Sequence, residues 1–214
     1  MVKRQPLFVT PLLVFHVEGC EDLNKRLLVD IQKWRAESSG IATSNRLGWH
    51  SERTFFGRQE PSFQELNKLI CRSLAAALKH GNPKLDISQT QMMMQGWVNV
   101  NEKGAFNTPH DHPDFLWSGC YYAQVPGAGA ARSIQNGGDI EFLDPRGSAL
   151  ITLQNDLAIG SGKHRVCPEP GMLLLFPSPL VHWVYPHEDD QARVSVAFNM
   201  KLARGKRKVA NPAS

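Results

Sequence analysis

Hydrophobic residues recur at helical spacing in two segments of the first third of the chain, residues 21–37 and 62–80. Each segment places its large apolar side chains on one helical face. These side chains are Leu23, Leu27, Leu28, Ile31 and Trp34 in the first, and Phe63, Leu66, Leu69, Ile70, Leu74 and Leu78 in the second. Ser62 and Glu65 have the spacing of a capping box, and Gly81 and Pro83 supply a stop signal. Two amphipathic helices are predicted.

From about residue 90 the pattern changes to short apolar runs separated by Gly, Pro, Asn and Asp. The runs are QMMMQGWVNVN, AFNTPHDH, WSGCYYAQV, DIEFLD, ALITLQ, KHRVCP, GMLLLFP, LVHWVYP and ARVSVAFNMKL. Nine short strands at this spacing indicate a β-sandwich or barrel rather than βαβ units. The proline-interrupted apolar run near the N-terminus reads as a further strand, not as a signal peptide.

These patterns predict one mainly β domain over residues 1–214. Residues 1–89 form an N-terminal part with helices and a strand. Residues 90–202 form a double-stranded β-helix, with the helices packed on one of its sheets, and residues 203–214 form a flexible basic tail. The Gly-rich stretch 127–138 is predicted to be a mobile loop, since it lacks the pattern of a phosphate-binding loop.

Composition narrows the class of protein. The chain has 214 residues, 42% hydrophobic and 21% charged, with a formal net charge of +4, which is ordinary for a soluble protein. The sequence lacks the basic stripe interleaved with aromatics that is typical of nucleic-acid-binding proteins, so no nucleic-acid partner is expected. No run reaches the roughly 18 apolar residues that span a membrane, so no membrane partner is expected. Four widely spaced cysteines without a CxxC pair indicate reduced thiols and a cytoplasmic location. The oligomeric state stays open.

Three segments carry candidate chemistry. His110-Asp111-His112-Pro113-Asp114 precedes an apolar strand, and His182 follows another strand after a turn. Arg193 and Ser195 come shortly afterwards, at the two-residue spacing that places both on one face of a strand. Arginine pairs bidentately with carboxylates. A His-x-acid pair, a distal histidine and a strand arginine together are typical of the facial triad of non-haem Fe(II) oxygenases.

From Gln91 to Leu202 the chain resembles the 2-oxoglutarate/Fe(II)-dependent dioxygenases, in particular their prolyl-hydroxylase-like branch. The stretches NEKGAFNTPHDH, SGCYY, GGDIEF and PGMLLLFPSPLVHWVYP carry the resemblance. With SNRLGWHS included, the whole chain is similar to a small group of bacterial and phage oxygenases. The resemblance implies a jelly-roll, cupin-like fold, Fe(II), 2-oxoglutarate as cosubstrate and O₂. It also implies a hydroxylase that acts on a small molecule or a peptide.

Two alignments of the metal ligands stay open. The glycine and proline of NEKGAFNTPHDH make His110 the first ligand and put His112 where the family has an aspartate. Counting back from SGCYY makes His112 and Asp114 an ordinary His-x-Asp pair. Both alignments use His182, and Asp111 points to the opposite face of an extended strand. Because the ligands must be neutral imidazoles, metal affinity is expected to fall below a pH of about 6.5, the unperturbed histidine value.

The resemblance also implies a cosubstrate site. Arg193 would bind the distal carboxylate of 2-oxoglutarate, helped by Ser195 and Tyr122. Ser118 matches a family threonine four residues before that tyrosine, and Asn101 stands where the branch has a site-lining tyrosine. The remaining candidates line a substrate pocket: Trp97, Asn99 and His50.

Two other functions stay open at this stage. Gly104, followed after five residues by His110-x-His112, also fits the first motif of cupin-type dioxygenases that do not use 2-oxoglutarate. The missing glutamate of that motif and the presence of Arg193 and Ser195 argue against it. The other alternative is a non-catalytic module that binds a metal or a carboxylate on the same fold.

Overall fold

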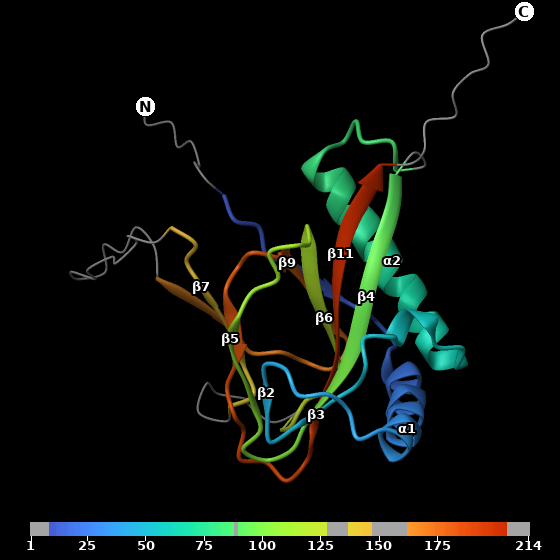
Figure 1. Cartoon of the computed structure of the whole chain (residues 1–214), viewed down its shortest axis with the longest axis vertical. Helices are drawn as coiled ribbons and strands as arrows, with labels where there is room; N and C mark the ends of the chain where they lie inside the picture. Colours follow the sequence, from blue (N-terminus) through green and yellow to red (C-terminus); the bar gives the residue numbers. More distant parts are fainter. Residues whose placement is uncertain (1–8, 88–89, 128–136, 147–161, 205–214) are drawn as a thin grey trace, which may run out of the picture.

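The computed structural model describes residues 9–87, 90–127, 137–146 and 162–204. In this part of the chain two antiparallel sheets face each other, and the helices cover the outer side of one of them (Figure 1). The six-stranded sheet has the order β1 (Leu13–His16), β9 (Met172–Pro177), β6 (Trp117–Gln124), β11 (Arg193–Arg204), β4 (Thr90–Asn101) and β3 (Trp49–His50). The five-stranded sheet has the order β2 (Asn45–Arg46), β5 (Phe106–His110), β10 (His182–Val184), β7 (Ile140–Leu143) and β8 (Lys163–Val166). The predicted mainly β, double-stranded β-helix fold is confirmed.

Both helices form where the apolar periodicity predicts them, α1 at Glu21–Glu37 and α2 at Pro61–Gly81. The predicted capping box is wrong. Glu60 is the N-cap and makes no side-chain cap bond, because Pro61, whose fixed φ suits the first helical position, starts the helix. Ser62 instead donates to Asp30 Oδ2 at 2.6 Å. A short 3-10 helix, η1 (Phe55–Gly57), precedes α2.

The six-stranded sheet is buried on both faces, and successive residues of β6 show why. Tyr121 packs in the cluster between this sheet and the helices, whereas Cys120 and Tyr122 pack in the cluster between the two sheets. Alternate side chains of a strand point to opposite faces, so a strand covered on both sides reads as a continuous apolar run. The inner face of this sheet is where polar side chains gather.

Strand register brings these polar side chains together. On β11, Arg193 pairs with Asn101 of β4, and Ser195 pairs with both Asn99 of β4 and Tyr122 of β6. Gly104, with a φ of 76°, lies in the turn that carries the chain from β4 into β5 of the opposite sheet. Glycine tolerates this left-handed backbone without strain.

Eight of the nine predicted core strands form. The ninth, ALITLQ, lies outside the described residues, as do most of the Gly-rich loop and the chain from residue 205 onward. β11 continues to Arg204, two residues beyond the predicted end of the core. The segment between α1 and α2 contains β2 and β3.

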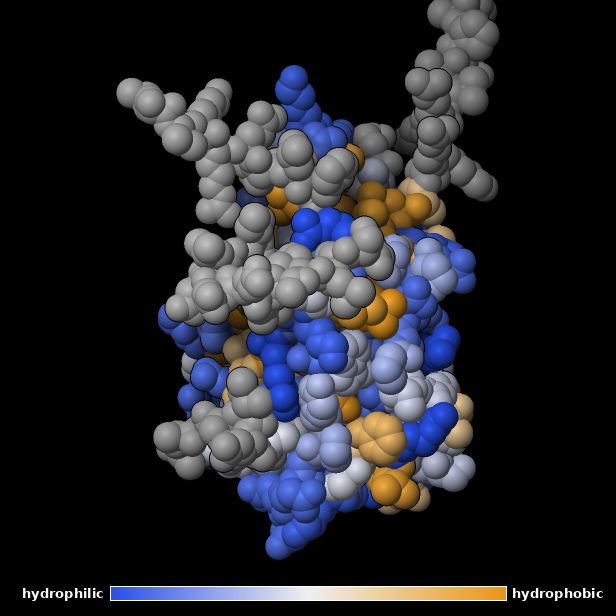
Figure 2. All heavy atoms as spheres, turned by 90° about the vertical axis from the view of Figure 1, so that its left-hand side faces the viewer, coloured by the Kyte–Doolittle hydropathy of each residue, from blue (hydrophilic) through white to orange (hydrophobic). Residues whose placement is uncertain are grey.

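Seen from the side of the five-stranded sheet, the described surface is mainly hydrophilic, with separate hydrophobic patches (Figure 2). Exposed Lys163 and His164 of β8 belong to this sheet. None of the helices in the described part of the chain combines the length and apolar character needed to cross a membrane.

Candidate metal and cosubstrate site

Two histidines face each other on neighbouring strands of the five-stranded sheet. His110 ends β5, His182 begins β10, and the two are partners in the antiparallel register with ring centroids 4.4 Å apart. His112 lies just beyond the end of β5, and its ring is 5.1 Å from that of His110 and 5.5 Å from that of His182. One nitrogen of each ring lies within 4.8 Å of the other two. Small side-chain rotations would bring all three to one metal ion, for which zinc–imidazole distances of about 2.0–2.1 Å are a guide.

Backbone carbonyls fix the orientation of two of these rings. Nδ1 of His110 lies 2.7 Å from the carbonyl oxygen of Thr108, and Nδ1 of His182 lies 2.8 Å from that of Leu180. A carbonyl oxygen only accepts, so each Nδ1 carries the proton and each Nε2 keeps a lone pair for a metal. Such bonds are typical of metal-binding histidines. The His112 ring has an edge-to-face contact with Trp97, with ring centroids 5.8 Å apart.

Burial keeps the three imidazoles neutral. Burial, the charge of His110 and the charge of Arg53 lower the pKa of His112 to about 4. Burial and the charge of His110 lower the pKa of His182 to about 3. Burial also lowers the pKa of His110 itself. The expectation that protons compete with a metal near pH 6.5 therefore needs revision, because the folded protein holds these rings neutral at lower pH.

The two nearby aspartates lie apart from the histidine cluster. Asp111 and Asp114 are both exposed, and neither belongs to the group of side chains whose ligand atoms converge. Asp114 lies in the loop between β5 and β6, where the chain no longer alternates as a strand. The structure therefore favours the alignment with His110 as a ligand, and the part of Asp114 in metal binding stays a prediction.

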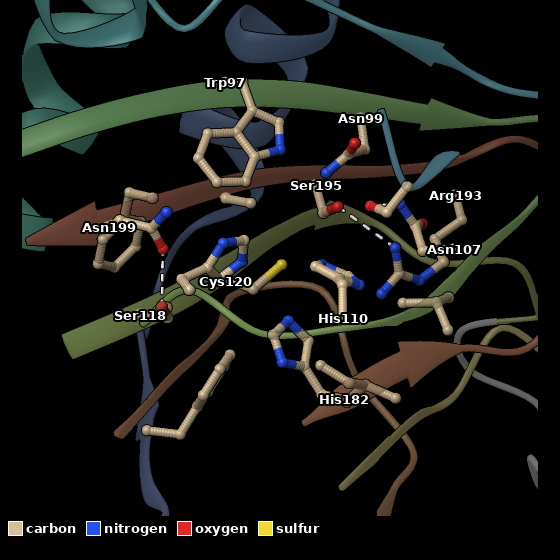
Figure 3. A pocket seen from close by; sticks show the side chains of 18 residues that line it. Trp97, Asn99, Asn107, His110, Ser118, Cys120, His182, Arg193, Ser195 and Asn199 are labelled. Carbon is tan, nitrogen blue, oxygen red and sulfur yellow. Dashed lines mark hydrogen bonds between the residues drawn. The ribbon is translucent and has the colours of Figure 1, made fainter. Parts of the chain in front are cut away.

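Arg193 projects into the cavity that the three histidines line, as Figure 3 shows for His110 and His182. Its side chain is 1% exposed. Nε donates to the carbonyl oxygen of Gly138 at 3.0 Å, and Nη1 donates to Ser195 Oγ at 3.3 Å. Nη2 is buried without a hydrogen-bond partner, and no carboxylate among the described residues forms an ion pair with the guanidinium. An uncompensated buried charge costs several kcal/mol, so this group is suited to an anionic ligand.

Tyr122 lies beside this arginine, with its ring centroid 4.9 Å from Arg193 Cζ. Its hydroxyl is buried and has no hydrogen-bond partner. Burial raises the pKa of Tyr122 well above its usual value, so the hydroxyl stays a donor. Arg193 Nη2, which is charged, and the Tyr122 hydroxyl are thus two donors without partners, and they lie beside Ser195 at this end of the cavity.

Ser118 and Asn101 take positions different from those the resemblance implied. Ser118 pairs with Asn199 across β6 and β11, and its hydroxyl is hydrogen-bonded to Asn199 Oδ1 at 2.7 Å and to Ser178 Oγ at 2.9 Å. It lies at the opposite end of the cavity from Arg193 (Figure 3). Four residues of strand span about 13 Å, so Ser118 and Tyr122 lie well apart along β6, and the part of Ser118 in cosubstrate binding stays a prediction. Asn101 donates to Asn107 Oδ1 at 3.2 Å and does not line the cavity.

The substrate-pocket candidates lie on the open side of the same sheet. Trp97 and Asn99 line the cavity, and Asn99 Oδ1 is buried without a partner. His50 belongs to β3. It is buried, stacks on Trp97 with ring centroids 5.3 Å apart, and does not line the cavity.

Sequence reasoning missed other lining residues, among them Cys120, Asn107 and Asn199. A signal for two of them was present. Asn199 shares the face of Arg193 and Ser195, since it follows Ser195 by two strand repeats, and Cys120 stands two residues before Tyr122. Asn107 comes from β5 of the opposite sheet, which only the paired register reveals.

Comparison with known proteins agrees with this geometry. Residues 95–199 match the family model described as "Putative 2OG-Fe(II) oxygenase". No curated protein sequence matches the chain.

Solved structures share the fold over most of the chain. A prolyl-4-hydroxylase of Pseudomonas putida is 16% identical with a TM-score of 0.60, over 89% of this chain and 91% of that one. HygX of Streptomyces hygroscopicus, solved with nickel and 2-oxoglutarate, is 12% identical with a TM-score of 0.59, over 90% and 83%. The non-haem α-ketoglutarate-dependent epimerase SnoN from nogalamycin biosynthesis is 12% identical with a TM-score of 0.59, over 93% and 80%.

The jelly roll is the fold that these solved structures share with the chain, and the histidine cluster could bind a metal. Residues 95–199, just under half of the chain, are thus similar to the 2-oxoglutarate- and Fe(II)-dependent oxygenases. The cofactors of this family are Fe(II), 2-oxoglutarate and O₂.

Proposed function

We propose that the protein is a hydroxylase in which His110, His112 and His182 hold Fe(II), while Arg193 binds the distal carboxylate of 2-oxoglutarate. The observation that carries the proposal is the buried, unpartnered Nη2 of Arg193 in the same cavity as three neutral imidazoles. A ligand that chelates the metal and ends in a carboxylate would use both features at once.

The residues present fit both groups. Three neutral imidazoles leave both charges of a divalent metal uncompensated, which favours an anionic chelating ligand. Tyr122 and Ser195 stand beside Arg193 and would orient the same carboxylate. When bound, Fe(II) and 2-oxoglutarate supply with O₂ the oxidising power needed to attack a C–H bond.

The chain itself contributes positioning and exclusion of water. Arg193 and Tyr122 would orient the cosubstrate along the inner face of β11. Apolar side chains from both sheets line the cavity near the histidines and would limit access of water: Ile140, Phe176 and Val184. Trp97 and Asn99 would line the substrate side, with His50 supporting Trp97 from behind.

Hydroxylation is the simplest outcome for this set of groups, because it needs no residue to deliver a proton or a second group to the substrate. The shared fold does not decide the outcome, since prolyl hydroxylases and an epimerase have it alike. We propose a small molecule or a peptide as substrate.

Binding and turnover measurements test this function. Protein purified without air is titrated with Fe(II) and then with 2-oxoglutarate, followed by calorimetry, and succinate is measured after O₂ is admitted. Tight 2-oxoglutarate binding that requires metal, together with O₂-dependent succinate, supports the proposal. O₂ consumption without 2-oxoglutarate would favour the cupin-type dioxygenase, and binding without any O₂ consumption would favour the non-catalytic module. A product that carries one additional oxygen atom identifies the hydroxylase.

A further inference from the structure

β3 is the edge strand of the six-stranded sheet, next to β4. His50 of β3 pairs with Asn99 of β4 and stacks on Trp97. The chain continues along β4: Ser51 N–H donates to the carbonyl oxygen of Val98 at 3.0 Å. This edge segment therefore follows the strand that carries Trp97 and Asn99.

Arg53 lies on this edge, beside the ring of Trp97. Its Cζ is 5.6 Å from the Trp97 ring centroid, and its side chain is exposed. Trp97 in turn contacts the His112 ring edge to face. A free cation thus stands one indole ring away from a proposed metal ligand.

A second arginine of the chain shows what a purely structural stack looks like. Arg58 lies over Trp34, with Cζ 4.3 Å from the ring centroid, and it is also paired with Glu60. Arg53 has no comparable partner: within the described residues it makes no ion pair and no hydrogen bond through its guanidinium. Packing against an indole therefore does not account for the charge of Arg53.

The charge balance of the proposed site also favours a further anionic ligand. The distal carboxylate of 2-oxoglutarate would neutralise Arg193, and the other carboxylate would leave one positive charge on a metal held by three imidazoles. An ordinary His-x-Asp site would have no such excess. Arg53 adds a further positive charge. Asp111 is exposed, acts on the His110 side of the cluster and makes no ion pair with Arg53.

We infer that Arg53 and Trp97 form a binding point for an anionic group of the primary substrate, a carboxylate or a phosphate. The inference rests on the proposed function and narrows its substrate class. The guanidinium fork pairs with either anion in a planar, bidentate way, and the indole beside it packs against the adjoining part of the substrate. Binding there would leave the remainder of the substrate between Trp97 and the three histidines.

Small probes test this without knowledge of the substrate. Inorganic phosphate, propionate and the neutral analogue propionamide are titrated into Ni(II)- and 2-oxoglutarate-saturated protein without O₂. The indole N–H resonance of Trp97, assigned with Trp97→Phe, reports binding by NMR. The variants are Arg53→Gln and Arg53→Lys, with Arg72→Gln as a control that removes an exposed arginine from α2.

We expect saturable binding of at least one anion and none of propionamide. Arg53→Gln should weaken that binding by about tenfold, the typical worth of a hydrogen bond to a charged group, whereas Arg72→Gln should leave it unchanged. Arg53→Lys should retain part of it. Which of the two anions binds more tightly separates a carboxylate substrate from a phosphate substrate.

Equal anion affinity of Arg53→Gln and the wild type, or no saturable anion binding by the wild type, overturns the inference. Metal and 2-oxoglutarate affinities measured on the same samples report separately on the proposed function. If those groups fail to bind while the anion titration of the metal-free protein still depends on Arg53, the function is wrong and the anion site remains.

Discussion

His110 and His182 are cross-strand partners, and their ring centroids lie 4.4 Å apart. Partner residues in an antiparallel pair have closely spaced Cβ atoms, so the two strands hold two imidazoles ready for one ion before any metal binds. His112 joins them from the loop beyond β5. The site thus combines two ligands fixed by a sheet with one that depends on a loop.

This difference predicts an order among the ligand variants. Each of His110→Ala, His182→Ala and His112→Ala should weaken metal binding. The loss should be larger for the first two, because backbone carbonyls orient their rings, and such support is typically worth about 10- to 100-fold in metal affinity. Competitive titration of Ni(II) against a chelator measures this order. A larger loss for His112→Ala than for His182→Ala would contradict it.

Asp114→Asn separates the two alignments of the metal ligands. Asp114 is exposed and lies outside the histidine cluster, so we expect this variant to bind metal and 2-oxoglutarate as tightly as the wild type. His112→Ala provides the comparison under the same titration conditions. Loss of metal by Asp114→Asn, with retention by His110→Ala, would restore the His-x-Asp alignment.

The ends of strands mark where prediction from the sequence stopped. Period-two alternation placed Arg193 and Ser195 on one face of a strand, because both residues lie inside a long strand, whereas Tyr122 was found through the resemblance. It could not choose between His110 and Asp114, because β5 ends at His110 and alternation no longer applies beyond it. There the His112 N–H donates to the carbonyl oxygen of Ser178, and this long-range bond sets the course of the loop.

Other features of the fold and the site have equally specific causes. Ser118 shares a face with Tyr122, but strand rise separates the two by about 13 Å, a distance that the sequence alone provides. The capping box at Ser62 failed because Pro61 begins the helix one residue earlier. The cavity wall contributed by β5 and β10 depends on pairing between distant segments, which periodicity within one segment does not encode.

Arg193→Met should separate cosubstrate binding from metal binding. The variant should keep the metal and lose on the order of 2–5 kcal/mol of 2-oxoglutarate affinity, the range measured for buried charge pairs. Without ligand it should be no less stable than the wild type, because the substitution removes a buried charge that lacks a carboxylate partner in the described residues. Calorimetry and thermal unfolding of the metal-free protein measure these effects. Unchanged 2-oxoglutarate affinity would remove Arg193 from the site.

Adjacent tyrosines offer a matched pair of variants. Tyr122→Phe removes a hydroxyl without a partner, so stability should be maintained while 2-oxoglutarate binding weakens by about 1.5–3 kcal/mol, the worth of a hydrogen bond to a charged group. Tyr121→Phe removes a hydroxyl that donates to Asn24 Oδ1 at 2.7 Å on the other face of β6. It should cost about 1–3 kcal/mol of stability and leave 2-oxoglutarate binding intact. The same effect of both variants on 2-oxoglutarate binding would contradict the assignment of Tyr122.

Acid should destabilise the metal-free protein well before its carboxylates titrate. The pKa values of His112 and His182 lie near 4 and 3 in the folded protein, whereas an unfolded histidine has a pKa of about 6.5. Between these values the unfolded chain binds more protons than the folded chain, so stability rises with pH in this window. The contribution of these neutral imidazoles to stability should therefore be fully present above about pH 6.5 and should decrease progressively toward pH 4.

Thermal unfolding in the presence of a chelator, at steps from neutral pH downward, measures this dependence. His182→Phe is the informative variant, because it removes the most buried imidazole and should flatten the curve. Saturating Ni(II) should raise the unfolding temperature. Because the folded chain keeps its imidazoles neutral, this gain should persist on acidification to about pH 4 and shrink only below it, where protons compete with the metal for the ligands of the folded protein. A pH near 5 lies well inside the window between about 4 and 6.5. If the melting temperature of the metal-free wild type stays constant from neutral pH down to this value, burial does not hold these imidazoles neutral.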